Sequence, residues 1–340
     1  MLRIKDNSQN TRRKAVKLAI LVLAHKNINQ LFRLINRLNH IDVDIFIHFD
    51  QKWNITEDYM NRLKAINEGS IFFVNRRISV SLDTWSLVDA TIELIKISKQ
   101  IEHDNGVHYI YTALLSGQDY PIKNIDYILS LLKKHYPKPF IDCTPWDRSN
   151  WVYGKFNRLP SEAIVNMFIN SYMKSSIIRK IVKVPIFLLF NTIKIFYNNP
   201  YKNLQGLKCK LYGGSAWWLL PDIAINDMLC EYNNPHSEII PILKNTFTPE
   251  ETFFQILIMR SNVASLVELN TKDALTQNCL TYAHFTDEGK PFIGHPYILT
   301  VDDFKRIIKL PHCFARKFDE VVDSEVLDLI DQEILNYKRS

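Results

Sequence analysis

The feature of this 340-residue sequence that most constrains its fold is a regular alternation of strand-like and helix-like segments over the first 145 residues. Runs rich in β-branched and aromatic residues predict strands at Leu18–Ala24, Val43–Phe49, Ile71–Val74 and Val107–Leu115. Apolar residues at helical spacing predict helices at Ile28–Leu38, Glu57–Ile66, Thr84–Lys99 and Ile125–Lys134. This alternation predicts an α/β fold with a mostly parallel sheet and helices on both faces.

In such open sheets, ligands bind beyond the carboxyl ends of the strands. The polar residues that follow the predicted strands include His25, Asp50, Lys52 and Asp119. We expect the first three to contact a nucleotide. Trp85, at the start of a predicted helix near the same strand ends, either joins them by stacking or packs into the core.

The composition is that of a folded protein, with 46% hydrophobic residues, 12% aromatic residues and nine glycines. The net charge of +6 favours anionic partners such as phosphates, nucleotides, acidic glycans or a membrane face, and it is too small to indicate nucleic acid. The five cysteines show no metal-ligand spacing, which favours reduced, buried thiols in a cytoplasmic protein.

The chain divides into four predicted parts. Residues 1–16 form a basic tail, because Leu18–Ala24 is short for a signal peptide and His25-Lys26 stand where small cleavage-site residues belong. Residues 17–145 form a nucleotide-binding half, residues 146–320 form the acceptor-binding and catalytic half of the same domain, and residues 321–340 carry a C-terminal helix. No run of eighteen apolar residues predicts a transmembrane helix.

The stretch 172–197 mixes basic and apolar residues around Pro185. This pattern is typical of a helix on an anionic membrane surface, which would place the protein at the inner face of the cytoplasmic membrane. The alternative is a pair of ordinary helices that cover the sheet or an acceptor groove. A non-catalytic glycan- or lipid-binding protein at the membrane surface is therefore the rival to an enzyme.

The stretch from Gly213 to Trp218 places two tryptophans after a small-residue turn. Both rings, with Ser215 and Ala216 before them, could seat a sugar, and core packing is the alternative for the rings. Some thirty residues later, Pro249-Glu250-Glu251 is predicted to begin an apolar helix that runs through Met259. A carboxylate at a helix start stays ionised and can act as a general base, and Glu250 and Glu251 compete for that role.

Arg316 and Lys317 stand between two phenylalanines. Two cations flanked by apolar anchors could hold a diphosphate, and a solvated basic pair beside Asp319-Glu320 is the alternative. The sequence has no Gly-x-Gly-x-x-Gly turn, Walker A loop or His-Glu-x-x-His. The strand Val107–Leu115 carries His108-Tyr109-Ile110 rather than Asp-x-Asp, so we expect no metal or other cofactor.

Seven segments, in order, resemble the core-2/I-branching β-1,6-N-acetylglucosaminyltransferase and peptide O-xylosyltransferase family (glycosyltransferase family 14), in its bacterial branch. The segments are Leu23–His25, His48–Lys52, Thr84–Val88, Leu115–Ile122, Gly214–Trp218, Pro249–Phe254 and Phe314–Phe318. The resemblance implies a GT-A-type, Rossmann-like sheet and an inverting, metal-independent transfer from a UDP-sugar to a hydroxyl of a glycan or glycolipid. UDP-N-acetylglucosamine is the first expected donor, and UDP-xylose is the second.

The resemblance also implies roles for individual residues. The glutamate two positions after the proline, Glu251, would be the base, and Arg316 and Lys317 would bind the diphosphate. The nucleotide contacts would be Asp50, Lys52 and Trp85, with His25 beside them at a strand end. The donor-sugar region would be Ser215 to Trp217. Trp218, from the tryptophan pair, and Asp119, from its place after a strand, complete the predicted sugar- and acceptor-binding residues.

Overall fold

The computed structural model of the chain describes residues 15–66, 68–147, 181–186, 200–271, 278–285 and 295–335, with a few other positions between 148 and 199. Its main sheet has five strands in the order β3-β2-β1-β4-β8. The first four are mutually parallel and β8 is antiparallel to β4. Their bounds are Ser70–Phe73 (β3), Val43–Phe49 (β2), Ala15–Ala24 (β1), Val107–Ser116 (β4) and Leu219–Pro221 (β8).

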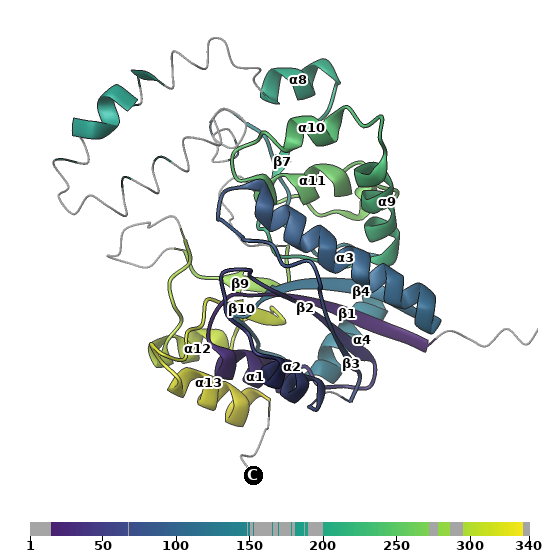
Figure 1. Cartoon of the computed structure of the whole chain (residues 1–340), viewed down its shortest axis with the longest axis vertical. Helices are drawn as coiled ribbons and strands as arrows, with labels where there is room; N and C mark the ends of the chain where they lie inside the picture. The colour runs from purple at the N-terminus through teal and green to yellow at the C-terminus, as the bar shows by residue number, and fades with distance from the viewer. Residues whose placement is uncertain are drawn as a thin grey trace, which may run out of the picture.

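Helices cover both faces of this sheet (Figure 1). One core contains α3 (Trp85–Asn105), α9 (Asp222–Asn233), α10 (Ile239–Leu243) and α11 (Phe253–Ile258). The other contains α1 (Ile28–Arg37), α2 (Glu57–Lys64), α4 (Ile125–His135), α12 (Phe304–Ile307) and α13 (Glu325–Leu329). Alternate β1 side chains enter the two cores, because successive strand residues point to opposite faces.

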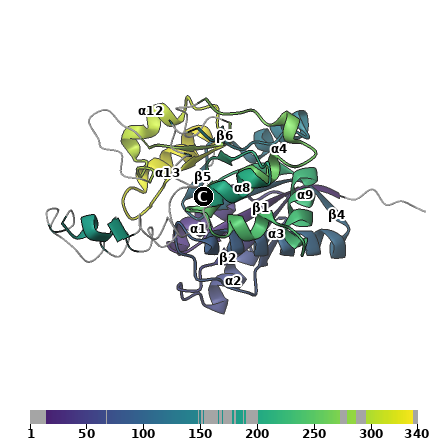
Figure 2. The same cartoon turned by 90° about the horizontal axis from the view of Figure 1, so that it is seen from above.

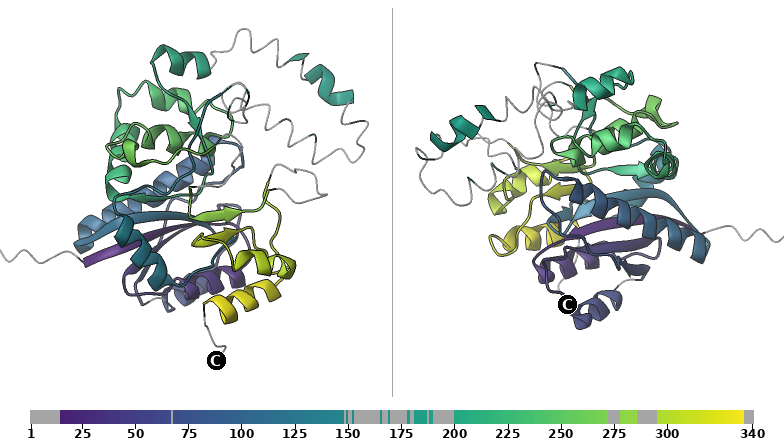
Figure 3. Two further views of the ribbon diagram at one scale, coloured as in Figure 1. Left: turned by 180° about the vertical axis from the view of Figure 1, so that it is seen from behind. Right: turned by 45° about the horizontal axis from the view of Figure 1, so that its top comes forward.

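A small second sheet, in the order β5-β10-β9, lies beyond the carboxyl ends of the parallel strands. It consists of β5 (Asp119–Pro121), β10 (Phe314–Arg316) and β9 (Thr281–Ala283). The antiparallel register of β10 and β5 sets Arg316 opposite Asp119. Figures 2 and 3 show the yellow C-terminal elements at this end of the molecule, away from the start of β1.

A third, two-stranded sheet pairs β6 (Thr144–Pro145) with β7 (Tyr212–Gly213), near α8 (Pro200–Gly206). None of the five cysteines forms a disulfide; Cys230 is exposed and the other four are buried. No described helix is long and apolar enough to cross a bilayer. Most of the 172–197 stretch lies outside the described residues.

The predicted α/β class and mostly parallel sheet are confirmed, and β2 has the predicted bounds. Helix α3 runs six residues further than predicted and ends at Gly106, whose φ of 63° is the left-handed conformation that terminates helices. The single helix predicted from Pro249 is wrong. A 3₁₀ turn, Pro249–Glu251, precedes α11, because Thr252 has a φ of −134° and interrupts the helix. The C-terminal helix predicted within residues 321–340 is α13 followed by a π-helical turn, Ile330–Ile334, in the described residues up to 335.

Candidate active site

Four basic side chains gather beyond the carboxyl ends of the parallel strands. His25 and Lys26 directly follow β1, and Arg316 and Lys317 lie at the end of β10. Desolvation by the surrounding protein lowers the pKa of His25, although part of its surface remains in solvent. The positive charges of Lys26, Lys317 and Arg316 lower this pKa further, while Asp50 raises it. These charges therefore share one neighbourhood.

Arg316 is held from two sides. Its Nε donates a hydrogen bond of 2.9 Å to Oδ1 of Asp119, and its guanidinium lies 4.1 Å from the ring centre of Trp217. Asp119 is fully buried and also accepts a hydrogen bond from the backbone N–H of Ser116. Among the described residues, the terminal nitrogens of Arg316 have no recorded partner, so they remain able to bind an anion.

Lys317 is half-buried, and no carboxylate of the described residues lies within 4.0 Å of its ammonium. Burial, and then the positive charges of Arg316 and Lys26, lower the pKa of Lys317, while Asp319 raises it. An ammonium among other cations, without a counter-ion, is electrostatically unfavourable. The arrangement therefore favours the binding of an anion at this point.

The end of β2 is tied to the next loop through Asp50. One oxygen of this carboxylate accepts the backbone N–H of Lys52 at 2.8 Å, and the other accepts that of Val80 at 3.2 Å. Three residues further on, the backbone N–H of Asp83 donates to Oε1 of Glu250 at 3.2 Å. The loop 78–83 therefore connects the β2 end to the 3₁₀ turn that carries the two candidate glutamates.

The structure separates these two glutamates. Glu250 is buried and holds the loop 78–83, whereas Glu251 is half-exposed. Thr248, just before the turn, has a φ of 49°, which is strained for a β-branched residue. Such strain is common where a structure fixes a functional side chain. Glu251 is therefore the better placed of the two to meet a substrate.

The turn carrying Glu251 also contacts the glycine turn that follows β7. The backbone N–H of Gly214 donates to the carbonyl of Glu251 at 2.9 Å, and Gln255 Nε2 donates to the carbonyl of Ser215 at 2.8 Å. A Cβ on Gly214 would lie 1.7 Å from the carbonyl oxygen of Asp142, so glycine is required for this close approach.

These contacts close into a ring, here called the strand-end ring. It runs from the β1 end to Asp50, through the loop 78–83 to the 3₁₀ turn, and across the glycine turn to Trp217. From Trp217 it continues through Arg316 and past Lys317 to Asp319, which accepts a hydrogen bond from Lys26 just after β1. The ring thus brings the candidate base and the candidate diphosphate-binding cations to one end of the sheet.

Three predicted sugar contacts need correction. Trp218 is fully buried and packs against Phe254 with ring centres 5.2 Å apart, so it is a core residue. Trp217 is only 8% exposed, and the face that meets Arg316 is not available to a sugar. Asp119 is fully buried and positions Arg316 instead of meeting an acceptor directly.

The remaining predicted residues lie around the strand-end ring. Trp85 donates its indole N–H to Asp89 at 2.6 Å, and its ring packs edge-on against Phe253. Lys52 is largely exposed and donates to the carbonyl of Val80. Ser215 and Ala216 are half-exposed within the glycine turn. Their binding roles stay predictions.

His108 does not belong to this site. It lies at the start of β4, with Nδ1 2.9 Å from Glu102 and Nε2 3.3 Å from Asp222. The position beyond the β4 carboxyl end is occupied by Ser116 to Asp119. In the described part of the chain, no three histidine, cysteine or carboxylate side chains gather as metal ligands.

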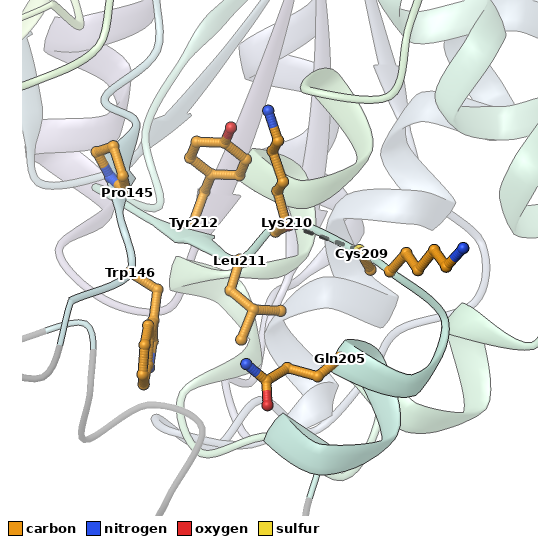
Figure 4. Close-up of a pocket in the computed structure, with 8 residues that line it drawn as sticks. Pro145, Trp146, Gln205, Cys209, Lys210, Leu211 and Tyr212 are labelled. Carbon is orange, nitrogen blue, oxygen red and sulfur yellow. Dashed lines mark hydrogen bonds between the residues drawn. The ribbon is translucent and has the colours of Figure 1, made fainter.

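A cavity of about 460 Å³ lies next to the β6–β7 pair and α8 (Figure 4). It contains none of the predicted site residues. Its lining is Pro145, Trp146, Gln205, Lys208, Cys209, Lys210, Leu211 and Tyr212. The cavity and the strand-end ring are adjacent along the chain, because β7 leads directly into the glycine turn.

Sequence reasoning missed Lys26 and Asp83. Lys26 donates to Asp319 at 2.5 Å, and Asp83 supplies the N–H that holds Glu250. The position of Lys26 just after a predicted strand was an available signal. The contact of Asp83 joins residues 167 positions apart, and no local pattern indicates it.

The sequence profile of the Core-2/I-Branching enzyme family matches residues 18–308, so the chain belongs to this family. Xylosyltransferase sqv-6 of Caenorhabditis briggsae is 22% identical over 97% of this chain and 38% of its own length. Mouse xylosyltransferase 2 is 23% identical over 93% of this chain and 33% of its own length. Beta-glucuronosyltransferase GlcAT14B of Arabidopsis thaliana is 29% identical over 37% of this chain and 26% of its own length. The chain thus spans well under half the length of each relative.

Among solved structures, S. aureus TarS in complex with UDP-GlcNAc is 10% identical, with a TM-score of 0.32 over 95% of this chain and 68% of that one. Core-mannan synthase A from Aspergillus fumigatus, in a Mn/GDP form, is 12% identical, with a TM-score of 0.33 over 77% of this chain and 74% of that one. Likenesses at such low scores carry no argument about this chain.

Proposed function

We propose that this protein is an inverting, metal-independent glycosyltransferase that moves a sugar from a UDP-sugar to a hydroxyl group of an acceptor. The observation that carries the proposal is the strand-end ring, which brings a half-exposed glutamate to the same end of the sheet as Arg316 and as Lys317, whose ammonium has no carboxylate within 4.0 Å among the described residues. Family membership supports the same reaction class.

In this reaction Glu251 accepts the proton of the acceptor hydroxyl as its oxygen attacks the anomeric carbon. The bond between that carbon and the UDP oxygen breaks on the opposite face, and UDP leaves with the bonding electrons. The configuration at the anomeric carbon is therefore inverted. Glu250, which is buried and holds the loop 78–83, positions the turn.

Negative charge develops on the diphosphate as the sugar–phosphate bond breaks. Lys317 and the terminal nitrogens of Arg316 stabilise this charge. Because Asp119 and Trp217 already fix Arg316, little reorganisation is needed when the charge appears. Positioned cations would thus perform the task of a divalent ion, so the proposal needs no metal.

UDP-N-acetylglucosamine is the first donor to test. The names of the relatives add UDP-xylose and UDP-glucuronic acid to the screen. A glycan or glycolipid is the proposed acceptor, and the basic, apolar stretch 172–197 supports a location at the inner face of the cytoplasmic membrane.

The decisive experiment is Glu251→Gln. Loss of a general base lowers kcat by about 10²–10⁴-fold, while the affinity for UDP, measured by calorimetry, stays unchanged. The donor is first identified by release of UDP from each candidate in the presence of EDTA.

Glu250→Gln is the matched control, because it keeps an oxygen that can accept the Asp83 N–H. A large loss of kcat in Glu250→Gln with none in Glu251→Gln would reverse the assignment of the base. Strict dependence on Mn²⁺ would contradict the role of the cations. Failure to release UDP from any donor would favour the rival glycan- or lipid-binding protein.

A further inference from the structure

Lys26 is the fourth basic residue at the strand ends, and sequence analysis assigned it no role. Its ammonium lies 2.5 Å from Oδ2 of Asp319, and 38% of its side chain is exposed. Asp319 is itself fixed, because Asn27 Nδ2 and the backbone N–H of Val321 donate to its other oxygen at 2.7 and 3.2 Å. The position of the Lys26 ammonium is therefore set by a rigid carboxylate.

This contact does not use all the hydrogen-bonding capacity of Lys26. An ammonium has three donors, and among the described residues Asp319 is its one recorded partner. The side chain also stands close to the other cations, since its charge acts on both His25 and Lys317. Lys26 follows β1 and Lys317 follows β10, and the contact of Lys26 with Asp319, two residues past Lys317, joins these two segments.

We propose that Lys26 is a further diphosphate-binding residue, held in place by Asp319 so that it meets the same phosphates as Lys317. This inference rests on the proposed function, because it deepens the description of the donor site. The nearby carboxylates are already engaged by protein groups: Asp119 by Arg316, Asp319 by Lys26 and Asn27, and Asp50 by backbone N–H groups. An anionic ligand would thus supply the missing negative charge.

The alternative is that Lys26 and Asp319 only fasten the C-terminal segment to the end of β1. That segment is also fastened by Gln30, whose side chain donates to the carbonyls of Gly117 and Phe318 and accepts the N–H of Glu320. Removal of Lys26 should therefore leave the segment attached, which makes its ligand-binding role testable.

The test measures binding of UDP, uridine and inorganic pyrophosphate to wild type and Lys26→Met by calorimetry. We expect UDP and pyrophosphate to bind about 10-fold more weakly and uridine to bind as before, because only the first two carry phosphates. Lys26→Arg should restore most of the affinity. Lys208→Met, which removes an exposed lysine beside the separate cavity, is the matched control and should change nothing.

Asp319→Asn distinguishes phosphate binding by Lys26 from attachment of the C-terminal segment, because it weakens the contact between Lys26 and residue 319 but keeps the charge of Lys26. We expect it to lower stability and to weaken UDP binding by less than Lys26→Met does, because the ammonium remains but is held less firmly. UDP affinity that is unchanged in Lys26→Met, or that falls equally for uridine, would overturn the inference. Wild-type protein that binds neither UDP nor pyrophosphate would instead contradict the proposed function.

Discussion

A cluster of charged side chains lies at each end of helix α1, and the two clusters differ in how completely their cations are paired with carboxylates. At its carboxyl end, Arg33 and Arg37 meet Asp328 and Asp331 of the C-terminal segment. At its amino end, among the basic residues of the strand ends, Lys26 and Arg316 each have a carboxylate partner, but Lys317 has none within 4.0 Å among the described residues. Both clusters join β1 or α1 to the last forty residues. In the first, called the balanced cluster, every cation has a carboxylate partner, and the cluster stabilises the fold. In the second, called the unbalanced cluster, Lys317 has no such partner, so the cluster is suited to binding an anion.

The balanced cluster is centred on Asp331, which is 4% exposed. Its oxygens accept hydrogen bonds from both arginines at 2.6 Å and from the hydroxyl of Tyr120 at 2.7 Å. Burial alone would raise the pKa of Asp331, but the hydrogen bonds from Arg37, Tyr120 and Arg33 outweigh it and lower the pKa. The ionised carboxylate therefore stabilises the native state.

The largest effect is expected from Asp331→Ala. It leaves two poorly exposed guanidiniums without their main partner, which costs about 3–5 kcal/mol of unfolding free energy. Urea denaturation measures this loss, and UDP affinity in the folded variant should stay unchanged. Asp328→Ala is the control, because Asp328 is more exposed and should cost less than about 1 kcal/mol. Equal losses in the two variants would show that the cluster is not centred on Asp331.

Lys317→Met should have the opposite effects: weaker UDP binding, with no loss of stability. Loss of a charge-assisted contact weakens UDP binding by about 10–100-fold. The free energy of unfolding should stay the same or rise, since a half-buried ammonium among cations is removed. Calorimetry and urea denaturation on the same variant check both parts. A fall in stability with unchanged UDP affinity would mean that both clusters stabilise the fold and that neither binds the ligand.

Sequence periodicity was sufficient to predict the α/β class and most strands and helices of the main sheet. Both ends of β2 were predicted, since Val43–Phe49 is bounded by polar residues and fully buried. The resemblance implied that Glu251 is the base and that the donor sugar binds at Ser215 to Trp217, and the structure brings the 3₁₀ turn into contact with the glycine turn. Local pattern and motif order therefore give the elements and the site segments.

The pattern did not predict how long-range contacts distribute the side chains. The pairing of Arg316 with Asp119 depends on the register of two short strands 197 residues apart, which no local pattern encodes. Trp217 and Trp218 are adjacent and chemically identical, but Trp218 packs against Phe254 in the core whereas Trp217 lies against Arg316. The single helix predicted from Pro249 failed because Thr252 adopts a φ of −134°, which separates the 3₁₀ turn from α11.

The smallest expected effect concerns pH, and it tests the unbalanced cluster alone. The pKa of Lys317 in the free protein is lowered from its ordinary 10.5 by burial and by Arg316 and Lys26. The folded protein therefore releases this proton at lower pH than the unfolded chain, and between the two pKa values stability rises with pH. UDP binding needs the ammonium and should weaken over the same interval, by a factor of a few. Lys317→Arg keeps its charge at these pH values, so its UDP affinity, measured by calorimetry from pH 7 upward, should decline less than that of wild type. If UDP affinity declines equally with pH in both proteins, a group other than Lys317 controls the loss of binding at alkaline pH.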